Sequence, residues 1–451
     1  MKFDFLNFLK CPFCGSRFEI EEAVTEVESE LINGCVKCDC NKFPILEGIL
    51  LIKEFSLDDC IKLIKERRIN EATVRYIWSE RFIIGNYLKR LDKLSLRFPP
   101  QSLVSFGKAL SSLAEKFSEG RLKKKYERFS KQQISFIDLL ETETKKGDLY
   151  PAYMKHRFST ETFWSLYPFL PLLKRKNEKV LDIACGGGHA SFVLSNYINL
   201  QQLCSVDISF KHLFYAKKYF APKAQFICLD AGLPLPFDNG IFNSILMSDA
   251  FGYVDSRVSL AREMKRCLVP EGLLLLLHVH NSLTFNLGQG HPLTPKSCLR
   301  LFNDVGIKVK VMPERKIIHD FIIKNKLDLL EDYTEDELNS SNGLILMATD
   351  DGSLFKVHDN VDKDFLSIKS NLIINPIYRV EKKDDKFLLE RPVSACCLGD
   401  HYPFSEEYLP KKIELDGICV KDNRQLCSFD AQKVEELMKK FILLNVPENY
   451  V

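Results

Sequence analysis

The stretch Val180-Leu-Asp-Ile-Ala-Cys-Gly-Gly-Gly-His-Ala-Ser191 decides the fold class of this chain. The short apolar run from Val180 to Ala184 predicts a buried strand. Three glycines then interrupt the run before a helical pattern begins near Ala190. Because glycine lets the backbone turn sharply and approach a ligand closely, the stretch predicts a strand, a ligand-facing turn and a helix.

Three further strand-sized apolar runs follow, and each has an acidic residue at or just past its end. In a doubly wound sheet, ligands bind at the carboxyl ends of the strands, where such acids can reach a ribose or a base. The runs and their acids are Leu203–Ser209 with Asp207, Phe226–Ala231 with Asp230, and Ile241–Asp249 with Asp249.

The order and spacing of these motifs resemble the class I S-adenosylmethionine-dependent methyltransferases. The resemblance implies an α/β fold with a seven-stranded Rossmann-like sheet, which the runs Ile307–Val311 and Gly343–Ala348 would complete. It also implies S-adenosylmethionine as the cofactor. Dinucleotide oxidoreductases share the glycine turn, but they bind a pyrophosphate there, which the acid Asp182 would repel.

The resemblance also assigns the contacts with the cofactor. The family motif reads Asp-x-Gly-x-Gly-x-Gly, so Ala184 stands in the first glycine position, where we expect a near-extended backbone that alanine tolerates. Gly186 and Gly188 would let the loop approach the methionine half of the cofactor. The side chains expected to contact it are Asp182 beneath the ammonium, Asp207 at both ribose hydroxyls, Asp230 at the adenine amino group, and Ile208 and Ser248, with the Ala231 backbone NH at a ring nitrogen.

Two Cys-x-x-Cys pairs, Cys11–Cys14 and Cys35–Cys38, lie near the start of the chain with 20 residues between them. This spacing predicts a zinc site, because two knuckles complete a tetrahedral set of four thiolates. Cys40 could replace Cys38 as the fourth ligand, although the C-x2-C knuckle is the commoner geometry, and a degenerate ribbon without metal is the other alternative. Four thiolates leave no open position for catalysis.

Two strands are expected around these cysteines, near Phe18–Ile20 and over Glu26–Ile32, with Phe43–Ile52 packed against them. A module of about 50 residues has too little core to fold without such a metal. The segment resembles the zinc-ribbon proteins related to the small activator subunit of tRNA and release-factor methyltransferases. Those proteins follow their Cys pairs with a similar aromatic-Pro-Ile-x-x-Gly-Ile run.

The length of 451 residues exceeds one ordinary core. We expect a zinc-ribbon module over 1–55, a helical insertion over 56–150, the methyltransferase domain over 151–350 and a small α/β appendage over 351–451. The resemblance predicts that the helix Tyr153–Trp164 closes over the cofactor, with plain core packing of its aromatic rings as the alternative. A second helix is expected over Ala431–Leu444.

The charge balance is nearly neutral, with 63 Lys and Arg against 61 Asp and Glu. A net charge of +2 creates no global field that would draw the chain to nucleic acid or a membrane. No run reaches the roughly 18 apolar residues of a membrane helix, and the start does not have the pattern of a signal peptide. Most of the 15 cysteines stand singly in apolar runs, which favours a reducing cytoplasm.

Methyl transfer needs in-line positioning and, for a hydroxyl or amine acceptor, a base. His278 and His280 end the fifth expected strand two residues apart, so both side chains should point to one face. Asp249 ends the fourth strand. We therefore predict His280, His278 and Asp249 as catalytic residues, with His280 as the base. The alternative is that the two histidines are hydrogen-bonded groups at a strand end.

The predicted function is methyl transfer to a small-molecule acceptor of the secondary-metabolite or saccharide type. The alternative is an rRNA or tRNA base methyltransferase whose zinc ribbon contacts RNA. A zinc ribbon before this fold also resembles the bacterial 23S rRNA guanine methyltransferases, which carry a late His ligand that this chain lacks. The near-neutral charge weakens the RNA alternative. The run Ser248–Gly252 also lacks the Asn/Asp-Pro-Pro-aromatic motif of enzymes that methylate exocyclic amines of bases.

Overall fold

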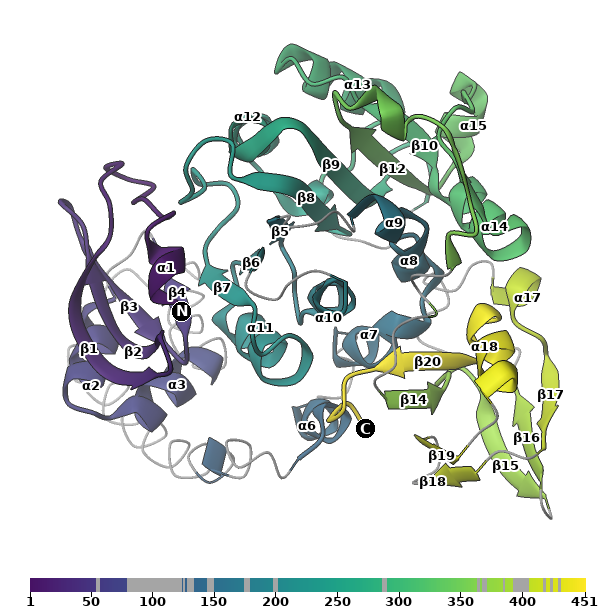
Figure 1. Ribbon diagram of the computed structural model, residues 1–451, viewed down its shortest axis with the longest axis horizontal. Coiled ribbons are helices and arrows are strands. Elements are labelled where there is room, and N and C mark those ends of the chain that lie inside the picture. The colour runs from purple at the N-terminus through teal and green to yellow at the C-terminus, as the bar shows by residue number, and fades with distance from the viewer. Residues whose placement is uncertain are drawn as a thin grey trace, which may run out of the picture.

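The computed structural model (Figure 1) shows a large mixed sheet flanked by helices. Among the described residues, no helix is both long enough and apolar enough to cross a membrane. The described residues are 1–53, 57–78, 124, 126–127, 134–143, 150–173, 179–197, 202–285, 290–362, 366, 371–383, 386–391, 405–416, 419–421, 425–428 and 431–451.

The large sheet has the strand order β1-β2-β3-β4-β7-β6-β5-β8-β9-β12-β10. The strands from β4 to β9 in this order run parallel, and β12 is antiparallel to both of its neighbours. The strands are β1 (Glu19–Val27), β2 (Glu30–Lys37), β3 (Lys42–Leu46), β4 (Ile49–Leu51), β5 (Val180–Ile183), β6 (Leu203–Asp207), β7 (Gln225–Cys228), β8 (Phe242–Ser248), β9 (Leu268–His280), β10 (Lys310–Pro313) and β12 (Gly343–Ala348).

The sheet therefore has eleven strands and not the expected seven. Seven come from residues 180–348, and the other four, β1 to β4, belong to the expected module over 1–55, here called the front module. The junction is the parallel pair β4–β7, in which Ile49 lies opposite Phe226 and Leu51 opposite Cys228. An uncovered β7 would present unpaired backbone groups, and β4 supplies their partners. The front module is thus an extension of the sheet, as the left side of Figure 1 shows.

Helices cover both faces of the sheet, so its parallel strands are buried on both sides. In β5, Val180 packs in one apolar cluster, and Leu181 and Ile183 pack in the other, as the period of two in a strand requires. Helix α13 begins at Pro295 because Thr294 accepts the Ser297 amide as its N-cap. The helices over the sheet are α10 (His189–Ser195), α11 (Phe210–Tyr215) with the π turn η5 (Ala216–Phe220), α12 (Arg257–Cys267), α13 (Pro295–Asp304), α14 (Glu314–Lys324) and α15 (Glu335–Ser340).

The expected helical insertion over 56–150 is described only in part. Residues 79–123 lie outside the described residues, and the described parts are helical. Tyr76 makes an edge contact with Phe210, so this region packs against α11. The described helices before β5 are α1 (Phe3–Leu6), α2 (Asp58–Lys65), α3 (Ile69–Trp78), α6 (Phe136–Glu143), α7 (Tyr150–His156), α8 (Glu161–Trp164) and α9 (Leu170–Leu173), with the 3-10 turn η2 (Arg157–Ser159) between α7 and α8.

The region after β12, together with the earlier strand β11, forms small sheets, and part of this region packs beside α7 and α8 (Figure 1). Trp164 of α8 stacks on Phe441 with ring centroids 3.9 Å apart. The elements are β11 (Lys326–Asp328) with β13 (Val357–Asp359), then β14 (Asn371–Ile374), β18 (Cys419–Lys421), β19 (Gln425–Ser428) and β20 (Leu443–Val446), then β15 (Arg379–Lys383), β16 (Lys386–Glu390) and β17 (Lys412–Leu415), and helices α17 (Ser405–Tyr408) and α18 (Ala431–Lys439).

Four expected element boundaries were wrong. The expected strand Glu26–Ile32 is divided by a turn in which Glu28 and Ser29 have positive φ, and the expected strand from Ile307 begins only at Lys310. The single helix Tyr153–Trp164 is broken by η2 and by the extended backbone of Thr160. The last helix ends at Lys439, because Phe441 has φ 52° and reverses the chain into β20.

Candidate functional site

The glycine turn after β5 leaves open space in front of Gly186. A Cβ placed on Gly186 would meet no atom within 4 Å, whereas one on Gly188 would lie 2.6 Å from the Ala216 Cβ. Gly188, with φ 90°, is therefore required for packing, and Gly186 leaves room for a ligand. The expected near-extended backbone at Ala184 is wrong: its φ is 55°, a left-handed conformation that the tight turn imposes.

Asp207 ties this turn to the end of β6. Its Oδ2 accepts the Gly186 amide at 2.9 Å, and its Oδ1 accepts the Ser209 amide at 2.8 Å. A carboxylate has about four lone-pair sites, so two remain for further donors. The predicted ribose-binding residue therefore lies beside the predicted glycine loop, with its side chain fixed by backbone amides.

Asp182 lies beneath the turn and is almost fully buried. Its Oδ2 accepts a hydrogen bond of 2.7 Å from the Ser191 hydroxyl, which also contacts Ser205. The pKa of Asp182 is raised to about 7, mainly because the carboxyl group is buried. The hydrogen bond from Ser191 lowers this pKa, and the negative charge of Asp207 raises it further. A cation placed above the turn would stabilise the ionised form of Asp182.

The remaining predicted cofactor residues lie at the neighbouring strand ends. Ile208 is 60% exposed directly after β6, so its apolar side chain can contact a flat ring. Asp230 is exposed after β7 and accepts the Gly232 amide at 2.8 Å, while Ala231 beside it is buried. Ser248 is the last residue of β8, and its hydroxyl accepts a 3.3 Å hydrogen bond from Arg157.

The three predicted catalytic side chains come together at the ends of β8 and β9. His280 Nε2 lies 3.1 Å from Asp249 Oδ1, and His278 Nε2 lies 4.0 Å from the same oxygen. Asp249 and His278 both have positive φ, 56° and 48°. His278 lies where the pairing of β9 with β12 shifts register, a bulge that turns its ring toward Asp249.

The segment Tyr153–Trp164, which the resemblance predicted to close over the cofactor, contacts this cluster through two of its side chains. The Tyr153 hydroxyl donates to Asp249 Oδ2 at 2.9 Å, and Arg157 Nη1 lies 3.5 Å from the same oxygen. The alternative of core packing also holds for part of the segment, because Phe163 and Trp164 are buried in the apolar core. The polar residues of the segment thus face the cluster and its aromatic rings pack inside.

Sequence reasoning missed Glu314. Its Oε2 lies 2.6 Å from His278 Nδ1, and both groups are buried. Glu314 is the first residue of α14. An acid is common at this position because its negative charge interacts favourably with the helix dipole, so nothing in the sequence indicated that Glu314 contacts a histidine. Burial lowers the pKa of His278, but the charges of Glu314 and Asp249 outweigh burial and raise it.

Helix α7 also lies on the glycine turn. The Met154 side chain fills the space next to Gly187 that a Cβ would need, and His189 Nε2 lies 3.0 Å from the Met154 carbonyl oxygen. The Tyr450 hydroxyl donates to the Lys155 carbonyl at 2.9 Å. The region after β12 therefore holds α7 against the turn, a contact between distant segments that the sequence did not predict.

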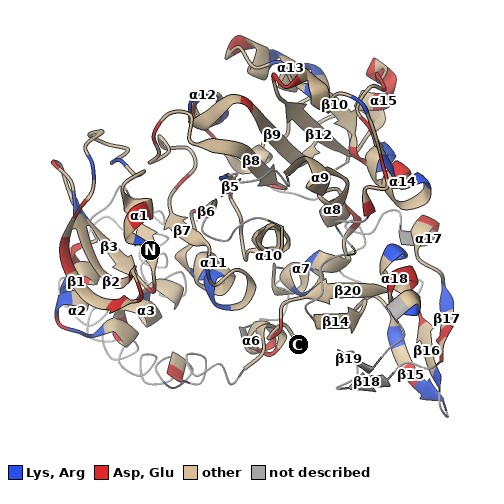
Figure 2. Ribbon diagram, viewed as in Figure 1, with Lys and Arg blue, Asp and Glu red and all other residues tan. Residues whose placement is uncertain are grey.

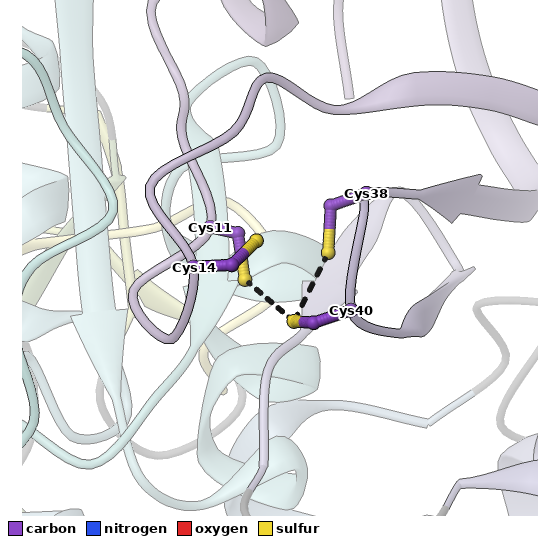
Figure 3. Close-up of side chains that lie close together, drawn as sticks. All are labelled: Cys11, Cys14, Cys38 and Cys40. Atoms are coloured by element: carbon purple, nitrogen blue, oxygen red, sulfur yellow. Dashed lines mark hydrogen bonds between the residues drawn. The ribbon is translucent and has the colours of Figure 1, made fainter.

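Four cysteine side chains of the front module converge (Figure 3). Cys40 Sγ lies 3.7 Å from Cys11 Sγ and 3.6 Å from Cys38 Sγ, and with Cys14 the four sulfurs lie within 4.8 Å of one another. The prediction of Cys35 as a ligand was wrong. Cys35 lies inside β2, paired with Pro44, and its thiol points to Glu21 at 3.4 Å, whereas Cys38 and Cys40 follow the end of the strand.

Residues 181–276 match a family profile described as a methyltransferase domain. A curated relative, the chloroplastic 2-phytyl-1,4-beta-naphthoquinone methyltransferase of Arabidopsis thaliana, is 28% identical over 115 residues, which are 24% of this chain. The chain spans 44% of the length of that relative. Residues 181–276 therefore form a methyltransferase domain, which agrees with the class that the sequence motifs predicted.

Solved structures similar to this chain include several methyltransferases. One is the complex between the Haloferax volcanii Trm112 methyltransferase activator and a methyltransferase, with 15% identity over 43% of this chain and 93% of that one, at a TM-score of 0.33. Another is the Haemonchus contortus phosphoethanolamine N-methyltransferase 2 in complex with phosphomonomethylethanolamine and S-adenosylhomocysteine, with 15% identity over 41% and 52% at a TM-score of 0.31. A third is an S-adenosylmethionine-dependent methyltransferase from Mesorhizobium loti, with 15% identity over 41% and 97% at 0.31.

Proposed function

We propose that this protein transfers a methyl group from S-adenosylmethionine to a small-molecule acceptor. In this reaction the methyl carbon leaves the sulfonium sulfur and bonds to the acceptor, which loses one proton, and S-adenosylhomocysteine is released. The observation that carries the proposal is the shared edge of the sheet. The Gly186–Asp207 contact and the Asp249–His280 contact lie at the carboxyl ends of adjacent parallel strands.

The cofactor half of the proposal rests on the fit of the residues to the cofactor. Open space before Gly186 suits the methionine half, and buried Asp182 suits its ammonium. The remaining lone pairs of Asp207 suit two ribose hydroxyls. Exposed Ile208 and Asp230 suit the adenine ring and its amino group, with Ala231 and Ser248 in the lining of this edge.

The acceptor half rests on the polar cluster next to that space. Asp249, His278 and His280 are mostly buried, and Tyr153 covers them. A buried polar centre with few side chains suits a small acceptor that enters it whole, whereas an RNA base would bring a phosphate backbone to the entrance. The naphthoquinone methyltransferase relative is consistent with a small acceptor.

An rRNA or tRNA acceptor is the second candidate. Its support is the front module, in which the Cys11, Cys14, Cys38 and Cys40 thiols form a set suited to one structural zinc ion. In the described part of the chain, Lys and Arg lie among Asp and Glu on α2 and α14, and they gather on β15 to β17 (Figure 2). On those strands Lys386 pairs with Glu414 and Lys412 with Glu390. Phosphate binding needs clustered cations beside the site, and these strands belong to the region after β12 and not to the glycine turn, so we favour the small-molecule acceptor and a role of the zinc in folding.

Transfer of a labelled methyl group tests the proposal. The purified protein is incubated with labelled S-adenosylmethionine and one of two acceptor mixtures, a cytoplasmic metabolite extract or bulk RNA. The extract is cytoplasmic because we place the reaction in a reducing cytoplasm. We expect label in small molecules, and its loss in Asp207→Ala. Label in RNA alone would establish the second candidate, and no S-adenosylmethionine binding in calorimetry would contradict both.

A further inference from the structure

Three donor atoms from two adjacent strands converge in the acceptor site. They are Asp249 Oδ1, His278 Nε2 and His280 Nε2, the last two at 4.0 and 3.1 Å from the carboxylate oxygen. One ligand atom of each residue lies within 4.8 Å of the other two. Two imidazoles and one carboxylate form a donor set that divalent transition metals prefer.

The other polar atom of two of these ligands is already held by a neighbouring side chain. His278 Nδ1 lies 2.6 Å from the Glu314 carboxylate, and Asp249 Oδ2 accepts the Tyr153 hydroxyl at 2.9 Å. A histidine that binds a metal commonly donates its second ring NH to a carboxylate, which fixes the tautomer. With the Nδ1 proton directed to Glu314, the lone pair on His278 Nε2 faces Asp249 Oδ1.

The charge of the cluster favours a cation. Asp249 and Glu314 supply two carboxylates, and Arg157 supplies one guanidinium at 3.5 Å from Asp249. Before the imidazoles are counted, these three charges sum to minus one, and a cation at the cluster, either a proton on His278 or a metal ion, compensates the buried charge. The side chains of Asp249, His278 and His280 are only 10%, 10% and 16% exposed, so water screens this charge weakly.

The backbone is held in an unfavourable conformation at the same place. Asp249 has φ 56° and His278 has φ 48°, which lie in the left-handed region that residues other than glycine rarely adopt. The Asp249 amide bonds to the Leu277 carbonyl oxygen at 3.0 Å, which joins the two strand ends. This backbone turns both side chains toward one point, and such strain is concentrated at functional sites.

We propose that Asp249, His278 and His280 bind one divalent transition-metal ion. Three protein ligands leave coordination positions open, in contrast to the four cysteines of the front module. A bound ion would lower the pKa of an acceptor hydroxyl or thiol that contacts it. This role of the ion in the reaction replaces the role of His280 as a free base, and it rests on the proposed function. The binding of the ion does not depend on the proposed function.

Manganese is the probe that separates the two metal sites. Mn²⁺ suits sites that contain carboxylate ligands, whereas thiolates prefer zinc and other soft ions. Because zinc also binds imidazole, the chelator-treated full chain is reloaded with one equivalent of zinc, which the four thiolates bind first. Mn²⁺ added afterwards should report on the Asp249–His278–His280 site. Paramagnetic resonance gives the free Mn²⁺ concentration directly, and calorimetry gives the stoichiometry.

We expect one Mn²⁺ per chain in the unmodified protein. Binding should weaken at least about 100-fold in His280→Ala and in the isosteric Asp249→Asn, and about 10- to 100-fold in Glu314→Gln, the range for loss of a carboxylate that orients a ligand. His319→Ala is the matched control, because this histidine lies on α14 but outside the cluster. It should bind Mn²⁺ normally.

Thermal melting shows whether each variant is folded. If His280→Ala does not fold, Asp249→Asn still tests the site. Absence of Mn²⁺ binding in the unmodified protein, or unchanged binding in a folded variant, would overturn the metal site. Methyl transfer that persists after complete chelation would overturn the role of the ion while the proposed function stood. Failure to bind S-adenosylmethionine would instead overturn the proposed function and leave Mn²⁺ binding unaffected.

Discussion

The edge of the sheet has two halves that are built in different ways. At the ends of β5 to β7, carboxylates accept backbone amides from residues close by, as Asp207 does from Ser209 and Asp230 from Gly232. At the ends of β8 and β9, side chains from four separate segments contact one another, with Tyr153 and Glu314 meeting Asp249 and His278. The first half therefore depends mainly on contacts between neighbouring residues, and the second on contacts between segments that are far apart in the chain.

The largest expected effect concerns the front module, whose strand β4 pairs with β7 of the cofactor half. Cys11→Ser should abolish zinc binding, because the ion loses one of four thiolates and structural zinc contributes on the order of 10 kcal/mol to folding of small modules. Since β4 pairs with β7, the loss should lower S-adenosylmethionine affinity. Metal analysis, thermal melting and calorimetry measure these effects. Full zinc retention in Cys11→Ser would contradict the site, and Cys35→Ser is the control that should keep its zinc.

Substitution in the acceptor half should separate turnover from cofactor binding. His280→Ala should lower turnover by roughly 10²- to 10⁴-fold, the range for loss of acid–base assistance to the acceptor, because the change removes a ligand of the ion that would lower the pKa of the acceptor. S-adenosylmethionine affinity should stay within about twofold, because His280 contacts Asp249 and not the glycine turn. Single-turnover kinetics and calorimetry on the folded variant test this. Nearly unaltered turnover would make His280 a packing group at a strand end.

Substitution in the cofactor half should have the reverse effect. Asp207→Ala removes two charge-assisted hydrogen bonds to the ribose, so the binding free energy of S-adenosylmethionine should become less favourable by about 2–4 kcal/mol. The same change removes the contact that anchors Gly186, so the turn itself should loosen. Asp207→Asn is the matched control of nearly equal size. Calorimetry showing unchanged affinity in Asp207→Ala would refute the ribose assignment.

The cofactor half was predictable from the sequence because its geometry follows from short-range rules. A strand, a glycine turn and an acid at the next strand end determine where Asp182, Gly186 and Asp207 lie. The left-handed backbone of Ala184 escaped prediction, because an alanine does not signal positive φ. The strands of the domain were likewise predicted, whereas their pairing with β4 depends on an edge that only the folded sheet presents.

The acceptor half and the cysteine cluster were predictable only in part. The pair His278 and His280 was found from its spacing, but Glu314 approaches from a helix 36 residues later in the chain. For the cysteines, spacing alone favoured Cys35, and the length of β2 decided otherwise. The strand extends to Lys37, so Cys35 lies inside the sheet and Cys40 takes its place in the cluster.

The smallest expected effect is a dependence of cofactor affinity on pH. The pKa of Asp182 is raised to about 7 by burial, so the acid is largely neutral at pH 5.5 and ionised at pH 8. An ammonium above it pairs only with the ionised form, and the affinity should rise up to about tenfold per pH unit below 7 and level off above it. The charged group that faces Asp182 is Asp207, and burial raises the pKa of the Cys185 and Cys204 thiols well above this range.

The stability of the free protein should change in the opposite direction. A folded-state pKa above the unfolded value of about 3.8 contributes stability that is present below that value and lost as the pH rises through about 7. Calorimetry and melting curves between pH 5.5 and 8 measure both trends. Asp182→Asn cannot ionise, so it should bind the cofactor weakly with a flat profile in this window and melt at a higher temperature than the unmodified protein at pH 8. An affinity independent of pH in the unmodified protein, or the same slope in Asp182→Asn, would contradict the placement of Asp182 beneath the ammonium and leave the ribose and adenine contacts of the cofactor half to be tested through Asp207.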